Sequence, residues 1–362
     1  MNAAPATAQL IEALLAFIAQ DGCSDAQFDA MALRVFAHQH AGNEPFRRFC
    51  QARGVTPRKV KSWRDIPAVP IDGFKDLALS CEPTAACERV FVTSGTTRGD
   101  LKGRNWHPDL AVWNASFRGN FARRFMQGDE RIRMGILFPD EAAMPNSSLA
   151  HYLQYALQEF GAAGSAHYVG ALGLDVAGIT EALVQAERSG QPYALLGASY
   201  SFVHLIDELK AAGRCFRLPP GSRILDTGGY KKQSRQVDFE EFYDALARAF
   251  GVPRERCINM YGMTELSSQF YDDGNAVVPS VKSGPHWIRS RVVDPLTGRE
   301  AAHGERGILV HCDLANYNSV TTILTEDIGV ATANGFLLLG RAEGAQAKGC
   351  SLAVEEFLKA AA

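Results

Sequence analysis

The sequence has no marked excess of charge of either sign and no long hydrophobic run. Its 362 residues carry a formal net charge of −3, so it lacks the basic footprint with which proteins bind nucleic acid or an anionic membrane. No apolar stretch approaches the roughly 20 residues that a membrane-spanning helix needs. The N-terminus has no basic segment and contains Glu12, which is typical of a helix and not of a signal peptide. We expect a cytoplasmic protein with no nucleic-acid partner and no membrane span.

The cysteines lack the arrangements that would give them a shared role. There are eight, none forms a C-x-x-C pair, and no histidines cluster beside them. They are Cys23, Cys50, Cys81, Cys87, Cys215, Cys257, Cys312 and Cys350. A zinc site or a disulfide framework is therefore not expected, and a reducing compartment fits the sequence.

The chain instead has an ordinary globular composition, with 46% hydrophobic and 21% charged residues, and strands that alternate with helical patterns. This alternation predicts an α/β fold. We expect a helical lead-in at 1–72 packed on the body, an α/β core at 73–286 and a β-rich subdomain of short antiparallel strands at 287–340. A short C-terminal segment, 341–362, carries a predicted helix over Ser351–Lys359.

The most informative stretch is Arg89–Gly103, which reads RVFVTSGTTRGDLKG. Val90–Val92 is a predicted buried strand, and a loop of hydroxyls and glycines follows it. Such a loop suits a phosphate chain, because glycine allows close approach and N–H and O–H groups donate to phosphate oxygens. The G-x-x-x-x-G-K-[ST] spacing of a P-loop is absent. The plainer alternative is a polar turn between two strands.

Three further loops lie where predicted strands end. They are Asp226–Tyr230 followed by Lys231 and Lys232, Tyr261–Glu265, and Thr325–Asp327, which a short strand separates from Gly340 and Arg341. Ligands of open α/β sheets bind at the carboxyl ends of strands, so we expect these loops to converge.

Each loop offers a group that suits part of a nucleotide. Tyr261 can present a ring face to a base, Thr264 can donate to a phosphate, and Glu265 can hold a cation that bridges phosphates. Asp327 can accept from ribose hydroxyls, and Arg341 can donate to ribose or to phosphate charge. Taken singly, each residue has a plainer role as a turn, a cap or a solvated charge. Together, in this order, they favour a nucleotide site.

The motifs TSGTT, YGMTE, TED and GR, in this order, resemble the adenylate-forming superfamily. Within it, three features resemble the acyl-protein synthetase (long-chain-fatty-acid–luciferin-component ligase) family of the bacterial bioluminescence operon. These are the chain length, the form GMTELSSQFYDD and the C-terminal GRAEGAQAKGCSLAVEEFL. The resemblance runs from about Gly73 to the end of the chain.

The resemblance implies the large N-terminal domain of an adenylate-forming enzyme, with mixed sheets flanked by helices and a small antiparallel β subdomain, and without the superfamily's C-terminal domain. It also implies ATP-dependent adenylation of a carboxylic acid, with Mg²⁺ at Glu265, a phosphate contact from Thr264, ribose on Asp327 and Arg341 at the hinge. The other nucleotide positions that the resemblance implies are the phosphate loop Thr93, Ser94, Gly95, Thr96 and Thr97, the adenine-pocket pair Gly228 and Gly229, and the stacking Tyr261 with Gly262.

Members of this family move the acyl group from AMP to a cysteine near their own C-terminus and then pass it to a partner acyl reductase. Cys350 matches that cysteine. The chemistry agrees, since an acyl-adenylate is an activated anhydride that a thiolate can attack to give a reactive thioester. Lys348 lies close in sequence and would favour the thiolate. The alternative is that Cys350 is a small buried hydrophobic residue.

The sequence departs from the superfamily pattern in two places. The phosphate loop has one extra residue before Lys102 and Gly103, which weakens the match of Lys102 to the loop lysine. The lysine that the C-terminal domain supplies to adenylation has no clear counterpart, and Lys348, Lys231 and Lys232 are candidates by proximity alone.

Two other functions stay open at this stage. The acyl group can instead pass to coenzyme A, a carrier protein or an amine, or the chain can bind nucleotide without turnover. The sequence does not identify the acid. An apolar pocket wall that suits a fatty or aryl acid is predicted from Met144, Tyr200, Phe202 and Met263.

Overall fold

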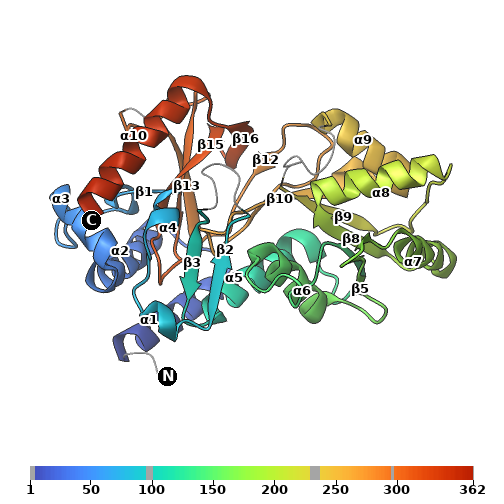
Figure 1. Cartoon of the computed structure of the whole chain (residues 1–362), viewed down its shortest axis with the longest axis horizontal. Coiled ribbons are helices and arrows are strands. Elements are labelled where there is room, and N and C mark those ends of the chain that lie inside the picture. Colours follow the sequence, from blue (N-terminus) through green and yellow to red (C-terminus); the bar gives the residue numbers. More distant parts are fainter. Residues whose placement is uncertain (1–4, 95–100, 229–236, 295–296, 362) are drawn as a thin grey trace. The chain divides into compact units, whose positions relative to one another are not determined.

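The computed structural model describes residues 5–94, 101–228, 237–294 and 297–361. The chain divides into two compact units, each built from separate stretches of sequence (Figure 1). The first unit comprises Met1–Gly119, Met263–Ser268 and Lys282–Ala362, and the second comprises Asn120–Gly262 and Gln269–Val281.

This division does not follow the boundaries expected at residues 72 and 286. Residues 73–119 belong with the N-terminal helices and the C-terminal strands. Strand pairing accounts for part of the difference, since β1 (Val69–Pro70) pairs in parallel with β15 (Thr322–Thr332), with Val69 opposite Ile323. The chain just before position 73 is thereby fixed to the β-rich part.

The second unit contains a mostly parallel sheet, which confirms the α/β fold class. Its order is β11-β10-β9-β8-β4-β5, and only β11 is antiparallel to its neighbour. The strands are β4 (Arg133–Leu137), β5 (Ala166–His167), β8 (Tyr193–Ala198), β9 (Arg223–Thr227), β10 (Cys257–Tyr261) and β11 (Phe270–Tyr271), with a small separate hairpin of β6 (Val169–Gly170) and β7 (Gly173–Leu174). The sequence predicted β8, β9 and β10 to within a few residues.

Helices of the second unit cover this sheet through apolar faces at helical spacing. They are α6 (Ser148–Phe160), α7 (Val176–Ser189), α8 (Ser199–Ala211) and α9 (Phe239–Phe250). Leu183, Phe202 and Leu246 come from three different helices and share one core cluster with Leu195 and Ile224 of the strands. This cluster fixes β8 and β9 and hence the loops that follow them.

The first unit is built on a mostly antiparallel sheet, as the short strands predicted after Trp287 indicate. The order along its main path is β12-β16-β15-β14-β13, and β1 joins it beside β15. The strands are β12 (Val281–Lys282), β13 (Ile288–Val293), β14 (Arg306–Asp313), β15 and β16 (Gly335–Arg341). A separate two-stranded hairpin, β2 (Arg89–Val92) and β3 (Arg104–His107), carries the loop of hydroxyls and glycines.

The first unit also contains helices. They are α1 (Pro5–Ile18), α2 (Asp25–Gly42), α3 (Glu44–Ala52), α4 (Gly73–Asp76), α5 (Ala111–Phe121) and α10 (Gly344–Ala361). The helical N-terminal region agrees with the sequence prediction. The C-terminal helix is longer than the predicted Ser351–Lys359, and Figure 1 shows it in red beside β15, with its last turns near α3.

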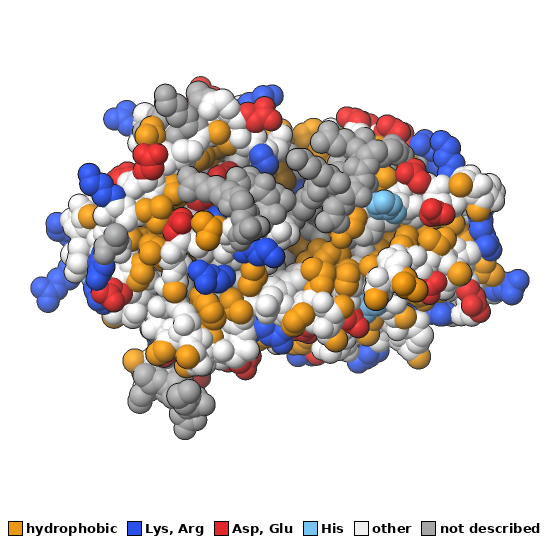
Figure 2. All heavy atoms as spheres, in the orientation of Figure 1, with side chains coloured by type: hydrophobic (Ala, Val, Ile, Leu, Met, Phe, Trp, Pro, Cys, Tyr) orange, Lys and Arg blue, Asp and Glu red, His pale blue; other side chains and the backbone are white. Residues whose placement is uncertain are grey.

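Charged side chains are mixed over the described surface. On the face drawn in Figure 2, basic and acidic side chains lie interspersed, and no large area carries one sign. This agrees with the formal net charge of −3.

Candidate active site

The loop of hydroxyls and glycines connects two antiparallel strands, β2 and β3. A connection between two strands was the plainer of the two interpretations of Arg89–Gly103. Two bonds continue the β2–β3 ladder past its last strand pair. The Thr93 N–H donates to the Gly103 carbonyl at 2.9 Å, and the Gly103 N–H donates to Thr93 Oγ1 at 2.9 Å. The predicted strand Val90–Val92 is therefore confirmed as part of β2, in a hairpin separate from the α/β sheet. Ser94 and Lys102 are exposed on either side of the hairpin end.

Residues Met263–Ser268 are held in the first unit by one buried carboxylate. The Asp313 carboxylate accepts from the Ser267 and Ser268 N–H groups at 2.9 and 2.8 Å, and from the Ser268 hydroxyl at 2.7 Å. A carboxylate with this many donors is satisfied in the interior and rigidly fixes the chain that supplies them.

Two asparagines fix the backbone of the YGMTE motif itself. Asn105 Nδ2 donates to the Thr264 carbonyl at 3.1 Å, and Asn316 Nδ2 donates to the Glu265 carbonyl at 2.8 Å. Asn105 lies on β3, so the hairpin and the motif are joined directly. Their two sequence regions, far apart in the chain, are thus adjacent.

The Glu265 side chain lies against the hairpin. A Cβ atom placed on Gly103 would stand 3.0 Å from Glu265 Oε1, which explains why glycine occupies this position. Glu265 is 3% exposed, and burial raises its pKa to about 7, although the charges of Lys75 and Arg341 oppose that shift. The carboxyl is therefore poised to change protonation state near neutral pH.

Asp327 and Arg341 form a cross-strand pair beside this carboxyl. They are register partners on β15 and β16, and Arg341 Nη1 lies 3.5 Å from Asp327 Oδ1. Arg341 also binds Glu326 at 2.7 Å. The charges of Arg341 and Asp327 both act on Glu265, so the three side chains belong to one electrostatic cluster.

The prediction that Thr325–Asp327 ends a strand is wrong. These residues lie inside β15, at an irregularity where Ile328 pairs with Ile308 but Leu324 pairs with Val310. Three residues of β15 thus oppose one of β14. Such a bulge re-aims side chains without ending the strand. It is this local distortion that presents Asp327 to the cluster.

Sequence reasoning missed Lys75 and Asp72. Lys75 Nζ lies 2.6 Å from Asp72 Oδ1, both side chains are at most 10% exposed, and the charge of Lys75 acts on Glu265. Both residues fall in a stretch read as scaffold, IDGFKDLAL, where no motif marks them. Only tertiary packing distinguishes this lysine from a solvated one.

Cys350 is buried and not poised as a nucleophile in this structure. It lies in α10, is 4% exposed, and packs in an apolar cluster with Val293, Ile308 and Val310. Its Sγ is 3.9 Å from the Thr325 carbonyl oxygen. Burial, reinforced by the Glu326 charge, raises the pKa of Cys350 to about 11. The described environment matches the alternative of a small hydrophobic residue.

The remaining described residues that the sequence assigns to a nucleotide site lie in the second unit. β9 and β10 are parallel, with Thr227 opposite Met260, so Gly228 and Tyr261 follow at the same sheet edge. Gly228 has φ +76°, which favours glycine, and Gly262 is exposed. Tyr261 is buried with its ring 5.8 Å from that of Phe270.

Several expected residues lie outside the described part of the chain. They are Gly95, Thr96, Thr97, Gly229, Lys231 and Lys232, together with the side chain of Lys348. Their roles stay predictions.

The described residues fit a magnesium ion that is shared with phosphates. No group of three His, Cys, Asp or Glu side chains gathers as a metal site in the described parts of the chain. Magnesium commonly takes only one or two carboxylates and completes its coordination with water and substrate phosphates. Glu265, a buried carboxyl beside the hairpin, would supply such a ligand once it loses its proton.

Comparison with protein families matches residues 171–359, more than half of the chain, to LuxE, the acyl-protein synthetases. The chain belongs to this family. Two curated relatives of the chain are named long-chain-fatty-acid–luciferin-component ligase. The one from Vibrio harveyi is 23% identical over 90% of this chain and 86% of its own length, and the one from Aliivibrio fischeri is 24% identical over 83% and 78%.

Solved structures of similar fold are adenylate-forming ligases. A 2-hydroxyisobutyryl-CoA ligase in complex with 2-HIB-AMP matches with a TM-score of 0.64 at 17% identity, over 89% of this chain and 69% of that one. ATP-bound MatB from Rhodopseudomonas palustris matches with a TM-score of 0.52 at 15% identity, over 72% and 49%. The chain therefore has the adenylate-forming fold. Its family and its curated relatives make it a ligase of that type. Among the residues that the structure describes, none of the helices combines the length and the hydrophobicity of a membrane-spanning helix.

Proposed function

We propose that this acyl-protein synthetase uses ATP to activate a long-chain carboxylic acid, transfers the acyl group to Cys350 and delivers it to a partner acyl reductase. The names of both curated relatives, which specify a long-chain fatty acid, support the choice of acid. Mg²⁺ is the proposed cofactor.

The cluster around Glu265 is the observation that carries this proposal. It combines a buried carboxyl, the backbone of Gly103 and the charges of Lys75, Arg341 and Asp327. A polyphosphate needs hydrogen-bond donors and cations, whereas a ribose needs a carboxylate acceptor. We assign phosphates to the hairpin and Glu265, and ribose to Asp327.

The first reaction is attack by a carboxylate oxygen of the acid on the α-phosphorus of ATP. The new bond is the acyl C–O–P linkage, and the bond to pyrophosphate breaks. Magnesium, when bound, neutralises charge on the leaving pyrophosphate. Lys75 and Arg341 are the described cations placed near Glu265, and we assign them the task of stabilising phosphate charge in the transition state.

The second reaction is attack by the Cys350 thiolate on the acyl carbon, which forms a thioester and releases AMP. In the described position of α10 this thiol is buried and protonated at neutral pH. Acylation therefore requires α10 to leave its place on the sheet, so that Cys350 reaches solvent and loses its proton.

Incubation with labelled long-chain acid, ATP and Mg²⁺ tests the proposal. We expect covalent, hydroxylamine-sensitive label on the wild-type protein and on Cys215→Ser, which removes an exposed thiol. Label is expected to be lost from Cys350→Ser, while acid-dependent exchange of pyrophosphate into ATP persists. Equal labelling of Cys350→Ser would refute the acceptor assignment, and no exchange with any fatty or aryl acid would refute adenylation.

The burial of Cys350 favours one alternative acceptor, an external thiol such as that of coenzyme A or a carrier protein. Thioester formation on added coenzyme A, unchanged in Cys350→Ser, would establish this second candidate. The two outcomes differ in which molecule carries the labelled acyl group. A gel detects label on the protein, and a chromatogram detects label on coenzyme A.

A further inference from the structure

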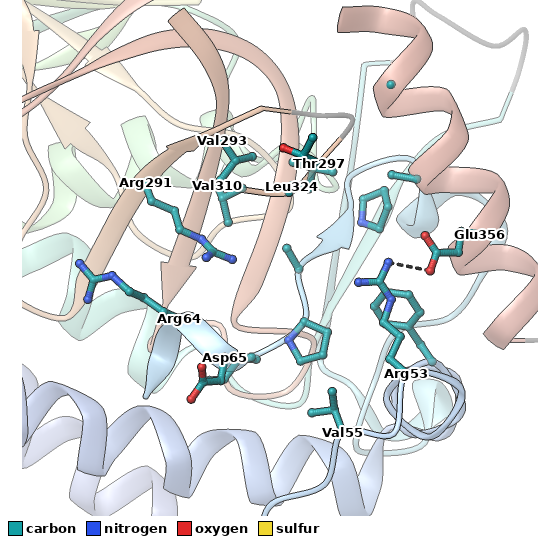
Figure 3. Close-up of a pocket in the computed structure, with 18 of the residues that line it drawn as sticks. Arg53, Val55, Arg64, Asp65, Arg291, Val293, Thr297, Val310, Leu324 and Glu356 are labelled. Atoms are coloured by element: carbon teal, nitrogen blue, oxygen red, sulfur yellow. Dashed lines mark ion pairs between the residues drawn. The ribbon is translucent and has the colours of Figure 1, made fainter. Parts of the chain in front are cut away.

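A cavity of about 750 Å³ lies in the first unit beneath α10, between α3, the segment leading to β1, and strands β13–β15 (Figure 3). Its volume is in the range of small-molecule sites. Part of the wall is apolar and comes from Val293, Val310, Leu324 and Pro70. The cavity is thus large enough for an extended hydrocarbon chain, and it offers one apolar wall beside a charged one.

Most charged groups that line the cavity already have partners. Arg53 pairs with Glu356 at 2.8 Å, which Figure 3 marks, and Arg64 pairs with Glu300 at 3.2 Å. The Asp65 carboxylate accepts from two backbone N–H groups at 3.0 Å. These groups need no ligand to satisfy them.

Arg291 differs from its charged neighbours. Its Nε is buried without a hydrogen-bond partner, and no described carboxylate lies within ion-pair distance of its guanidinium. Figure 3 shows its side chain extending from β13 toward the side where Arg64 and Asp65 lie. Burial lowers the pKa of Arg291, although the charges of Glu300 and Asp65 oppose that shift.

The apolar wall of the cavity is also the packing surface of Cys350. Val293 and Val310 contact the thiol's cluster and line the cavity, and Leu324 and Ala68 pack against the same cluster. Gly349, the residue before Cys350, lines the cavity as well. A hydrocarbon chain in the cavity would therefore lie one layer of side chains from the proposed acceptor.

We propose that this cavity binds a long-chain carboxylate, with the carboxylate on Arg291 and the alkyl chain along Val293, Val310 and Leu324 toward α10. The inference rests on the proposed function for its choice of acid. It adds a site for that acid, or for the acid released from the thioester, on the α10 side of the sheet.

The balance of charge and apolar surface favours this ligand over a phosphate compound. A single unpaired guanidinium can match one carboxylate, whereas a polyphosphate needs several cations and many N–H donors. The apolar wall gives no contact to a compact anion. Affinity should therefore rise with chain length, by up to roughly fourfold for each buried methylene.

Calorimetric titration of the full chain without ATP tests the site, using C8 to C16 saturated carboxylates, the matching alcohols and inorganic phosphate. Arg291→Gln should weaken binding of a C14 carboxylate by about 10- to 100-fold, since a hydrogen-bonded ion pair is lost, and should leave the C14 alcohol within about twofold. Arg64→Gln is the matched control, because Arg64 lines the same cavity but already has a partner, and it should bind the acid like wild type. Equal acid affinity in Arg291→Gln, or tighter phosphate than C14 carboxylate, would overturn the proposal.

A second variant fills the cavity without touching its charge. Ala353 lines the cavity from α10, and Ala353→Phe should abolish the dependence of affinity on chain length. Pyrophosphate exchange separates this inference from the proposed function. Binding that depends on Arg291 but no acid-dependent exchange would refute adenylation alone. Exchange without measurable binding in the absence of ATP would refute the cavity site alone.

Discussion

At the scale of single residues, the least expected property is the protonation of Glu265. The residue was predicted from its place in YGMTE, but its burial was not, because burial depends on Gly103 and Lys75, which come from distant sequence. A carboxyl with a pKa of about 7 is partly neutral in the ligand-free protein at physiological pH. Binding of a cation at this carboxyl must therefore release a proton.

Glu265→Gln should separate the catalytic and the structural consequences of this carboxyl. The folded pKa lies above the unfolded value, so the wild-type protein loses stability as pH rises from about 4.5 to 7, by about 3 kcal/mol. The glutamine variant lacks this loss. In urea unfolding, the free energy of unfolding of Glu265→Gln minus that of the wild-type protein should be larger at pH 8 than at pH 5. The rate of pyrophosphate exchange should fall by roughly 100-fold or more in the variant. If the difference in free energy of unfolding between variant and wild type were equal at both pH values, the assigned pKa of Glu265 would be contradicted.

At the scale of secondary structure, the strands were easier to predict than the points where they are distorted. The short strands predicted after Trp287 agree closely with β13, β14 and β16, whereas the one predicted over Ser319–Leu324 overlaps only the start of β15. The bulge at Thr325–Asp327 was missed because a bulge depends on strand pairing, not on local pattern. The start of α10 was missed because Gly344 and Gly349 weaken the helical signal, which packing on α3 and β15 overrides.

The α10 helix is anchored by its last turns. Phe357 is fully buried, and its ring lies 4.9 Å from that of Phe49. Phe357→Ala should lower stability by about 3–5 kcal/mol if α10 unfolds with the rest. If α10 detaches by itself, Cys350 should react with N-ethylmaleimide at least tenfold faster, measured by mass spectrometry relative to the exposed Cys215.

Leu352→Ala serves as the control, because Leu352 lies on the same helix but is 51% exposed. It should change neither stability nor the rate at Cys350. An unchanged rate in Phe357→Ala would mean that α10 does not open to expose the thiol.

At the scale of the whole molecule, the chain returns briefly to the first unit in the short segment Met263–Ser268, between two stretches of the second unit. Removal of the carboxylate in Asp313→Ala would leave the Ser267 and Ser268 N–H groups without their buried acceptor. Each such loss costs about 1–3 kcal/mol, so we expect a total of about 3–5 kcal/mol by urea unfolding. Asp244→Ala, which removes a surface ion pair with Arg254, should cost less than about 1 kcal/mol. A small effect of Asp313→Ala would mean that this segment is held by other contacts.

The overall α/β class and the order of motifs were readable from sequence, because each depends on local pattern. The sequence did not predict which stretches belong to the same unit, because this depends on strand pairings such as that of β1 with β15. Lys75 and Arg291 illustrate the same limit, since nothing local distinguishes them from solvated cations.

Because each unit is formed from several separate stretches of sequence, the positions at which the chain can be divided into fragments are also constrained. Each unit draws on stretches that the other unit interrupts, at Gly119, Gly262, Ser268 and Val281. No single break in the reading frame yields a fragment containing one complete unit and nothing of the other. Split-protein reporters and domain swaps with relatives would therefore need several simultaneous junctions.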